Sequence, residues 1–258
     1  MSDYQDIFSL NDCTAVVAGG ASGLGLEMSK ALLSNGCRVA IIGRTEERIL
    51  AVSETLSEEY NTNCLGIVGD ISDENTINQV VESISEVYEG KLNIAVNSAG
   101  INVRNEITKV SLKEWNQIQK VNLTGAFLFA KGLFPVLVES NFGRLINITS
   151  IFSSRSFAER VSYASSKGGL LQLTRTLAIE WAAYPITVNA ISPGPFLTDI
   201  NRPLLENPKQ YRKFCESIPL GRFGDPQEIV SACLFLCSRH SSYVTGANIL
   251  VDGGWTVR

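Results

Sequence analysis

The sequence predicts an α/β fold, in which helices cover both faces of a doubly wound parallel sheet to give three layers in a single domain over residues 1–258. Short β-branched runs alternate with amphipathic stretches along the whole chain, which is the rhythm of βαβ units. A glycine-rich segment follows the first of these runs directly. No repeat, low-complexity tract or glycine-serine linker interrupts the alternation, so nothing divides the chain into modules.

The strands and helices are expected in βαβ order from the N-terminus onward. The first strands are expected at Thr14–Ala18 and Arg38–Ile42, with helices near Leu24–Ser34 and Glu46–Glu59. Each helical stretch is long enough to return the chain to the starting edge of the sheet as a right-handed crossover. A long helical pattern also covers Val161–Tyr184. Further strands are expected at Cys64–Val68, Ile94–Asn97, Arg144–Thr149, Thr187–Ile191 and Asn248–Val251.

Between Ser192 and Asn207 the chain fits neither a strand nor a helix pattern. The stretch is rich in proline, with Pro193, Pro195 and Pro203. A segment of this kind beside a cleft can close over a ligand. We therefore expect a substrate lid around residues 193–217, although a plain surface loop would have the same composition.

Charge and composition exclude several classes of function. The net charge is −4 and the sequence has no run of Lys or Arg, so nothing in it indicates a basic surface that would bind nucleic acid or a membrane. The N-terminus lacks a basic segment followed by an apolar core, so we expect a cytoplasmic protein. The six cysteines form no C-x-x-C pair, and the single His240 cannot complete a metal site or a Ser-His-Asp triad, so we expect neither.

A phosphate-binding turn is indicated directly after the first predicted strand. Gly19, Gly23 and Gly25 have the spacing G-x-x-x-G-x-G, and a helical pattern follows. Glycines in this context allow a tight turn, close approach of backbone N–H groups to a pyrophosphate, and near contact between helix and strand. Because no Gly-Lys-Ser/Thr follows, the expected ligand is a dinucleotide and not a nucleoside triphosphate. Ser22 could bond the phosphate or serve as a turn or capping residue.

The end of the second predicted strand indicates which dinucleotide is preferred. A carboxylate at this point accepts hydrogen bonds from the ribose hydroxyls, whereas an arginine accommodates a 2′-phosphate. The chain has Gly43-Arg44 here, followed by the helix start at Thr45 and Glu46. A cation so close to the start of a helix is unfavourable unless an anion accompanies it. We therefore expect NADP(H) in preference to NAD(H).

Tyr163 and Lys167 lie four residues apart in the predicted helix, so both side chains lie on one face. A nearby ammonium and a cationic nicotinamide would favour the phenolate of Tyr163, whose unperturbed pKa is about 10. The pattern Y-x-x-x-K is frequent by chance. It gains weight from Ser150, which ends a predicted strand at the edge where ligands bind in such sheets and could orient a substrate oxygen.

Further motifs follow the glycine segment in order, namely Asn97-Ser98-Ala99-Gly100, Ser150, Tyr163-x-x-x-Lys167 and Pro193-Gly194. Together they resemble the pattern of the short-chain dehydrogenase/reductase family, and the resemblance covers essentially the whole chain. It implies a Rossmann-like fold and a nicotinamide-dependent oxidoreductase that transfers a hydride to or from a carbonyl or secondary alcohol.

The resemblance also implies roles for single residues. Ser150 positions the substrate oxygen, Tyr163 transfers the proton, and Lys167 holds the nicotinamide ribose while lowering the pKa of Tyr163. Asn122 matches the family's relay asparagine, although a residue bonding the backbone near Gly125 would look the same. The implied cofactor contacts are Gly19, Ser22, Gly23, Leu24, Gly25, Arg44, Asp70, Ile71, Asn97, Ala99, Gly100, Tyr163, Lys167, Pro193, Gly194 and Thr198.

Some positions depart from the family pattern or have a second interpretation. The family's usual Thr before the first glycine is Ala18 here, and its usual second Asn is Ser98. Both changes remove supporting hydrogen bonds and leave the reacting groups in place. Asp70 resembles the residue that meets adenine, yet an acidic turn residue would look the same.

Within the family the chain resembles gluconate 5-dehydrogenases and related sugar-acid or polyol reductases, through Ala99–Arg104, Ile218–Pro226 and Val251–Trp255. Arg104 and Arg155 are candidates to pair with a substrate carboxylate, and either could equally be a solvated or subunit-contact residue. The alternatives are a 3-oxoacyl carrier-protein reductase and a catalytically silent nucleotide-binding protein. The resemblance further implies a homotetramer.

Overall fold

The predicted strands form one parallel sheet with the order β3-β2-β1-β4-β5-β6-β7. The computed structural model describes residues 6–201 and 206–257. Strand positions agree with the predictions to within two residues at each end, and β6 is longer than expected because it continues through Pro193. The strands are β1 Thr14–Ala18, β2 Arg38–Gly43, β3 Leu65–Val68, β4 Ile94–Asn97, β5 Gly143–Ile148, β6 Ile186–Pro193 and β7 Asn248–Val251.

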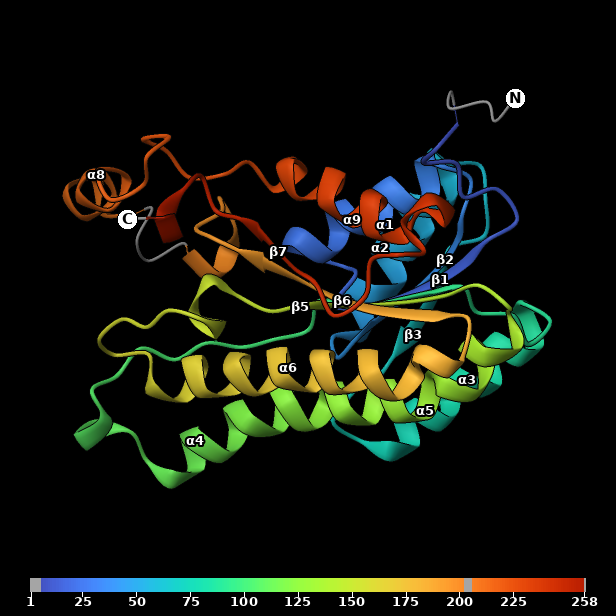
Figure 1. The fold of residues 1–258 in the computed structure, drawn as a ribbon, viewed down its shortest axis with the longest axis horizontal. Coiled ribbons are helices and arrows are strands. Elements are labelled where there is room, and N and C mark those ends of the chain that lie inside the picture. Colours follow the sequence, from blue (N-terminus) through green and yellow to red (C-terminus); the bar gives the residue numbers. More distant parts are fainter. Residues whose placement is uncertain (1–5, 202–205, 258) are drawn as a thin grey trace.

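Helices cover both faces of this sheet, so the three predicted layers are confirmed (Figure 1). In β1, Ala15 and Val17 pack into one apolar cluster with α1, α2 and α9. Val16 and Ala18 point to the other face and pack with α3, α5 and α6. Strand side chains alternate between faces, and a strand buried on both faces is apolar throughout. The helices are α1 Gly23–Ser34, α2 Glu46–Glu59, α3 Glu74–Val87, α4 Leu112–Gln119, α5 Gly125–Glu139, α6 Val161–Glu180, α8 Pro208–Cys215 and α9 Val230–Cys237.

The order of the strands places a crevice at the carboxyl end of β1. This strand pairs with β2 on one side and with β4 on the other. The chain moves outward from β1 to β3 and then returns to β4, so the crossovers diverge between β1 and β4. Ligands bind at such switch points in open α/β sheets. Because Ala18 is level with Ile42 and Asn97, the segments that follow these three strands emerge side by side.

The longest helical run, Leu112–Glu139, joins α4 to α5 through a π-helical turn at Lys120–Thr124. By length and composition alone this run could cross a membrane, although half of its most apolar window is buried inside the protein. Phe129, Leu133 and Leu137 of α5 pack against the sheet. Core helices of α/β proteins pass the same test of length and composition, so the burial explains the apolar sequence.

The proline-rich stretch after β6 is partly regular. Phe196 forms a β-bridge with Gly224, a 3-10 turn covers Asp199–Asn201, and α8 begins at Pro208. Residues 202–205, including Pro203, lie outside the described residues. The long helix α6 ends at Glu180, four residues before the predicted end at Tyr184, because a 3-10 turn at Trp181–Ala183 leads into β6.

Candidate active site

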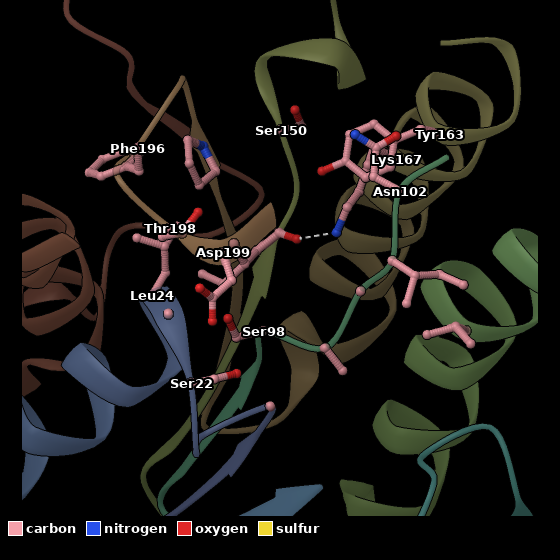
Figure 2. A pocket seen from close by; sticks show the side chains of 18 of the residues that line it. Ser22, Leu24, Ser98, Asn102, Ser150, Tyr163, Lys167, Phe196, Thr198 and Asp199 are labelled. Carbon is pink, nitrogen blue, oxygen red and sulfur yellow. Dashed lines mark hydrogen bonds between the residues drawn. The ribbon is translucent and has the colours of Figure 1, made fainter. Parts of the chain in front are cut away.

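A cleft with a cavity volume of about 390 Å³ opens at the carboxyl edge of the sheet. Its walls come from the glycine segment, the ends of β2, β4 and β5, the first turns of α6, and the segment after β6. In Figure 2, Tyr163 and Lys167 lie on one side of the cleft, and Phe196, Thr198 and Asp199 lie on the other. Segments far apart in sequence therefore converge at the predicted edge.

The glycine segment has the geometry that its spacing predicts. Gly19 and Gly23 have φ values of +74° and +52°, which residues with a Cβ adopt only under strain. A Cβ on Gly25 would collide with the carbonyl oxygen of Gly19, so the helix approaches the turn as closely as expected. Ser22 precedes α1 and lines the cleft, but its hydroxyl makes no capping hydrogen bond. That hydroxyl is exposed to a ligand at the start of the helix, and this geometry fits a bound pyrophosphate.

Two arginines border the cleft beside β2. Arg44 follows the strand and is exposed, as its proposed contact with a 2′-phosphate requires. Arg48 also lines the cleft and is exposed, although the sequence interpretation did not single it out. The available signal was the position of Arg48 in the first turn of α2, directly after the strand end that carries Arg44.

Asp70 and Ile71 line the same half of the cleft. The Asp70 carboxylate accepts hydrogen bonds from the backbone N–H and the hydroxyl of Ser72, at 2.9 Å and 2.8 Å. Asp70 is therefore a turn residue that also borders the cleft, and its contact with adenine stays a prediction.

The end of β4 contributes Ala99 and Gly100 to the cleft, but not Asn97. Asn97 is 1% exposed, and its Nδ2 donates to Oδ1 of Asn147 at 3.4 Å. Asn147 in turn donates to the hydroxyl of Thr174 on α6 at 3.0 Å. Asn97 therefore joins β4, β5 and α6 inside the protein, since its position in the strand directs the side chain into a helical layer. The side chain of Asn97 therefore lies outside the cleft, and the contact of this residue with the cofactor stays a prediction.

Lys167 lies one helical turn after Tyr163 in α6, and both line the cleft. The Lys167 ammonium donates to the carbonyl oxygen of Ile148 at 2.7 Å and lies 5.8 Å from the centre of the Tyr163 ring (Figure 2). Burial lowers the pKa of Lys167 to about 8. The amine therefore loses its proton more readily than a solvated lysine does.

The electrostatics of Tyr163 differ from the expectation. Burial raises the pKa of this phenol, while a hydrogen bond with Ser150 and the charge of Arg160 lower it. In the ligand-free protein burial is the largest effect, so Tyr163 keeps its proton. The family resemblance implies that Lys167 lowers this pKa, but the cation that lowers it in the structure is Arg160. A protonated phenol can donate to a carbonyl oxygen.

Ser150 lies two residues after the end of β5 and caps the 3-10 turn Ile151–Ser153. Its Oγ accepts a hydrogen bond from the backbone N–H of Phe152 at 3.2 Å. This bond fixes the rotamer and leaves the hydroxyl hydrogen for another acceptor. Ser150 and Tyr163 therefore present two hydroxyl groups to one region of the cleft.

Asn122 lies in the π-helical turn and is 1% exposed. Its side chain holds the backbone of Ile101, with Nδ2 donating to the carbonyl at 3.0 Å and Oδ1 accepting from the N–H at 2.9 Å. Nδ2 also donates to the hydroxyl of Ser166 on α6. A Cβ on Gly100 would lie 3.5 Å from Asn122 Oδ1 and 3.4 Å from Lys167 Nζ. Asn122 thus bonds backbone, as one interpretation predicted, but at Ile101 and beside the lysine.

The two arginines predicted to meet a substrate carboxylate are placed differently. Arg104 lines the cleft and donates to Oδ1 of Asn201 at 3.2 Å. Arg155 is exposed and does not line the cleft, because its guanidinium turns to the carbonyl of Thr256 at 3.0 Å. This placement is unfavourable for the predicted contact of Arg155 with a substrate carboxylate. Arg160, five residues later, lines the cleft instead and is 8% exposed.

The end of β6 and the segment after it close the far wall of the cleft, which Pro193, Gly194 and Thr198 line. A Cβ on Gly194 would lie 2.7 Å from the Cα of Asp252, so only glycine fits beside the end of β7. Other lining residues were not singled out by sequence, because nothing local marks them; they include Asn102, Phe152, Phe196 and Asp199.

Comparison with known proteins agrees with this geometry. A family model described as enoyl-(acyl carrier protein) reductase matches residues 19–256. The chain is 38% identical to a 3-oxoacyl-[acyl-carrier-protein] reductase FabG of Aquifex aeolicus, over 93% of this chain and 96% of the relative. It is 34% identical to the 5-keto-D-gluconate 5-reductase of Escherichia coli, over 98% and 99% of the two chains. A gluconate 5-dehydrogenase from Burkholderia cenocepacia, solved in complex with NADP and tartrate, superposes with a TM-score of 0.93 at 29% identity, covering 98% of each chain.

Proposed function

The chain belongs to the short-chain dehydrogenase/reductase family of oxidoreductases, and we propose that it transfers a hydride between NADP(H) and the carbonyl or alcohol carbon of a sugar acid such as 5-ketogluconate or gluconate. The observation that carries the proposal is the convergence of Ser150, Tyr163 and Lys167 in one cleft that Arg104 also borders. Similarity to a 5-keto-D-gluconate 5-reductase and a gluconate 5-dehydrogenase supports the substrate class.

The residues of the cleft fit a nicotinamide dinucleotide. Close approach at Gly19 and Gly25, and the exposed start of α1, suit a pyrophosphate that lies against backbone. When bound, the nicotinamide supplies or accepts the hydride. Gly100 lies against Lys167 beside Tyr163, where the nicotinamide end would be held, whereas Ala99 and Thr198 lie against the glycine segment.

The protein's own groups supply the proton in this reaction. In reduction the Tyr163 phenol donates its proton to the carbonyl oxygen as the carbon accepts hydride, and in oxidation the phenolate takes the proton back. The Ser150 hydroxyl donates a hydrogen bond to the same oxygen, which stabilises the charge that develops there. The charge of Arg160, which lowers the pKa of Tyr163, and the Lys167 ammonium, 5.8 Å from the centre of the Tyr163 ring, both favour the phenolate that remains after proton transfer.

We propose that Arg44 and Arg48 give the preference for NADP(H), since both border the cleft and neither is buried. Arg44→Ala is expected to raise the Kd for NADPH roughly 10-fold to 100-fold, because a charge-assisted bond to phosphate is lost. The Kd for NADH should change by less than about 3-fold. Fluorescence titration measures both constants, and Arg175→Ala, at an exposed arginine of α6 outside the cleft, is the control. Equal losses for the two cofactors would contradict the assignment.

A reductase screen tests the substrate class. The enzyme is assayed with NADPH and with NADH against 5-ketogluconate, neutral ketosugars and a 3-oxoacyl thioester. We expect the highest kcat/KM with NADPH and 5-ketogluconate. A preference for the thioester would assign the rival activity, which the 38% identity to FabG favours. Absence of turnover with every carbonyl would favour a silent nucleotide-binding protein.

We further propose a cytoplasmic homotetramer with a lid around residues 193–217. Exposed apolar side chains occur on two separate parts of the surface, which suits a protein with more than one interface. Phe127 and Ile179 lie on the helical layer formed by α3, α5 and α6, and Leu250 lies on the edge strand β7. In support of a lid, Phe196, Asn201 and Phe214 of the 193–217 segment reach the cleft.

A further inference from the structure

The half of the cleft that would hold substrate contains a buried guanidinium. Arg160 immediately precedes α6, three residues before Tyr163, and it is 8% exposed. Its Nη1 donates to the carbonyl oxygen of Glu159 at 3.2 Å. Its Nε is buried without a hydrogen-bond partner, and within residues 6–201 and 206–257 Nη2 has no partner either. The Nε and Nη2 groups form one edge of the guanidinium, and this edge matches the two oxygens of a carboxylate.

The backbone that holds this guanidinium in place contains a residue in a strained conformation. Glu159 has a φ of +64°, which is a strained conformation for a residue with a side chain. Its carbonyl oxygen accepts from Arg160 Nη1 and also from the backbone N–H of Asn105 at 3.3 Å. One carbonyl therefore fixes both the arginine and the loop after β4. Strain of this kind persists where the surrounding structure requires it, commonly at ligand sites.

Because Asn105 is tied to Glu159, its neighbour Arg104 lies close enough for the two guanidinium charges to interact. Burial lowers the pKa of Arg160 and the charge of Arg104 lowers it further, while the charge of the neighbouring Glu159 opposes both effects. Within the described part of the chain, no carboxylate lies within salt-bridge distance of either arginine. Two cations that repel each other beside an open cleft are stabilised when an anion binds between them.

The ring of Phe152 contacts both the Arg160 guanidinium and the Tyr163 ring, and so connects the arginine to the reacting groups. The Arg160 guanidinium lies over the Phe152 ring, 5.8 Å from its centre, and that ring packs edge-to-face against Tyr163 with centres 6.3 Å apart. Ser150 lies two residues before Phe152. The carboxylates that line the cleft are distant from this corner or engaged, since Asp70 bonds Ser72 and Asp199 lies across the cleft from Tyr163 (Figure 2).

We propose that Arg160, together with Arg104, forms a binding site for the carboxylate of the substrate and that Arg160 determines the preference for acidic over neutral substrates. The inference rests on the proposed function in one respect, namely that the reacting carbon lies beside Ser150 and Tyr163. The unpartnered edge of Arg160 receives the carboxylate side-on, and the more exposed Arg104 contacts it from the mouth of the cleft.

Binding without turnover tests the site directly. The enzyme–NADPH complex is titrated calorimetrically with D-gluconate and with D-glucitol, its neutral counterpart, because neither alcohol can react with the reduced cofactor. Arg160→Met should weaken gluconate binding roughly 30-fold to 100-fold, since two charge-assisted hydrogen bonds are lost. Arg104→Met should weaken it less. Glucitol binding and the Kd for NADPH should change by less than about 3-fold in either variant.

Arg155→Met is the matched control, because this arginine comes from the same loop but points away from the cleft. It should bind gluconate as the wild type does. Thermal unfolding checks the fold: ligand-free Arg160→Met should melt at or above the wild-type temperature, because it removes an unpartnered buried N–H group. Arg160→Lys keeps the charge but not the two-pronged edge, so it should recover only part of the affinity.

The possible outcomes separate this inference from the proposed function. Wild type that binds gluconate no better than glucitol, or Arg160→Met that loses both equally, would overturn it. A fall in NADPH affinity matching the loss of gluconate would place Arg160 on the cofactor and overturn it as well. If gluconate affinity depends on Arg160 but no keto acid is reduced, the carboxylate site is supported and the proposed sugar-acid reaction fails.

Discussion

Tyr163→Phe is expected to lower kcat for carbonyl reduction by about 10²-fold to 10⁴-fold, which is the usual contribution of a positioned proton donor. The substitution removes one hydroxyl and keeps the ring that packs against Phe152. The cofactor cradle at Gly19 to Gly25 is untouched, so the Kd for NADPH should remain at the wild-type value. Stopped-flow measurement of NADPH oxidation gives the rate, and fluorescence titration gives the affinity.

Tyr184→Phe is the control for this substitution, since Tyr184 lies after α6, is 43% exposed and does not line the cleft. Its turnover should equal that of the wild type. If Tyr163→Phe kept more than about a tenth of the wild-type rate, another group would have to deliver the proton, and the assignment of Tyr163 would be refuted.

The features that sequence predicted best are those with a local physical cause. Apolar side chains on both faces of β1 and the alternation of strands with helices specify a doubly wound sheet. Gly19, Gly23 and Gly25 were interpreted correctly because each has a steric requirement that only glycine meets. Tyr163 and Lys167 lie in one helix, where spacing alone fixes a common face. For these residues the local sequence is sufficient to predict the geometry.

The features that sequence missed depend on the direction of a side chain in a loop or at a strand end. Arg155 and Arg160 are five residues apart between Ser150 and Tyr163, and nothing local distinguishes them. Arg155 turns outward to Thr256, whereas the left-handed backbone at Glu159 turns Arg160 into the cleft. Asn97 lies at the predicted edge, but its side chain follows the strand alternation into the interior. The directions of these side chains are determined by contacts between segments that are distant in sequence.

Lys167→Met is expected to lower kcat/KM for carbonyl reduction by about 10³-fold and at the same time to stabilise the ligand-free protein. The loss of activity follows because the phenolate of Tyr163 no longer has the ammonium beside it. The gain in stability follows because Lys167 is only 4% exposed and burial lowers the pKa of its amine from 10.5 to about 8. A shift of this size costs roughly 3 kcal/mol at most, and the lost bond to Ile148 offsets about 1 kcal/mol. We expect a net gain of about 1–2 kcal/mol in the free energy of unfolding at pH 7.

The pH dependence of stability distinguishes this cause from improved packing of methionine. Because the folded pKa of Lys167 lies below its unfolded value, the unfolded wild type binds more protons between pH 8 and pH 10.5. Wild-type stability should therefore rise relative to the variant across this window, and the advantage of Lys167→Met should shrink toward zero. Urea unfolding at pH 7, 9 and 10.5 measures it. An advantage that stays constant with pH would show that packing, and not the buried charge, is responsible, whereas a shrinking one would show that the wild type retains a destabilising cation at the position where its chemistry needs one.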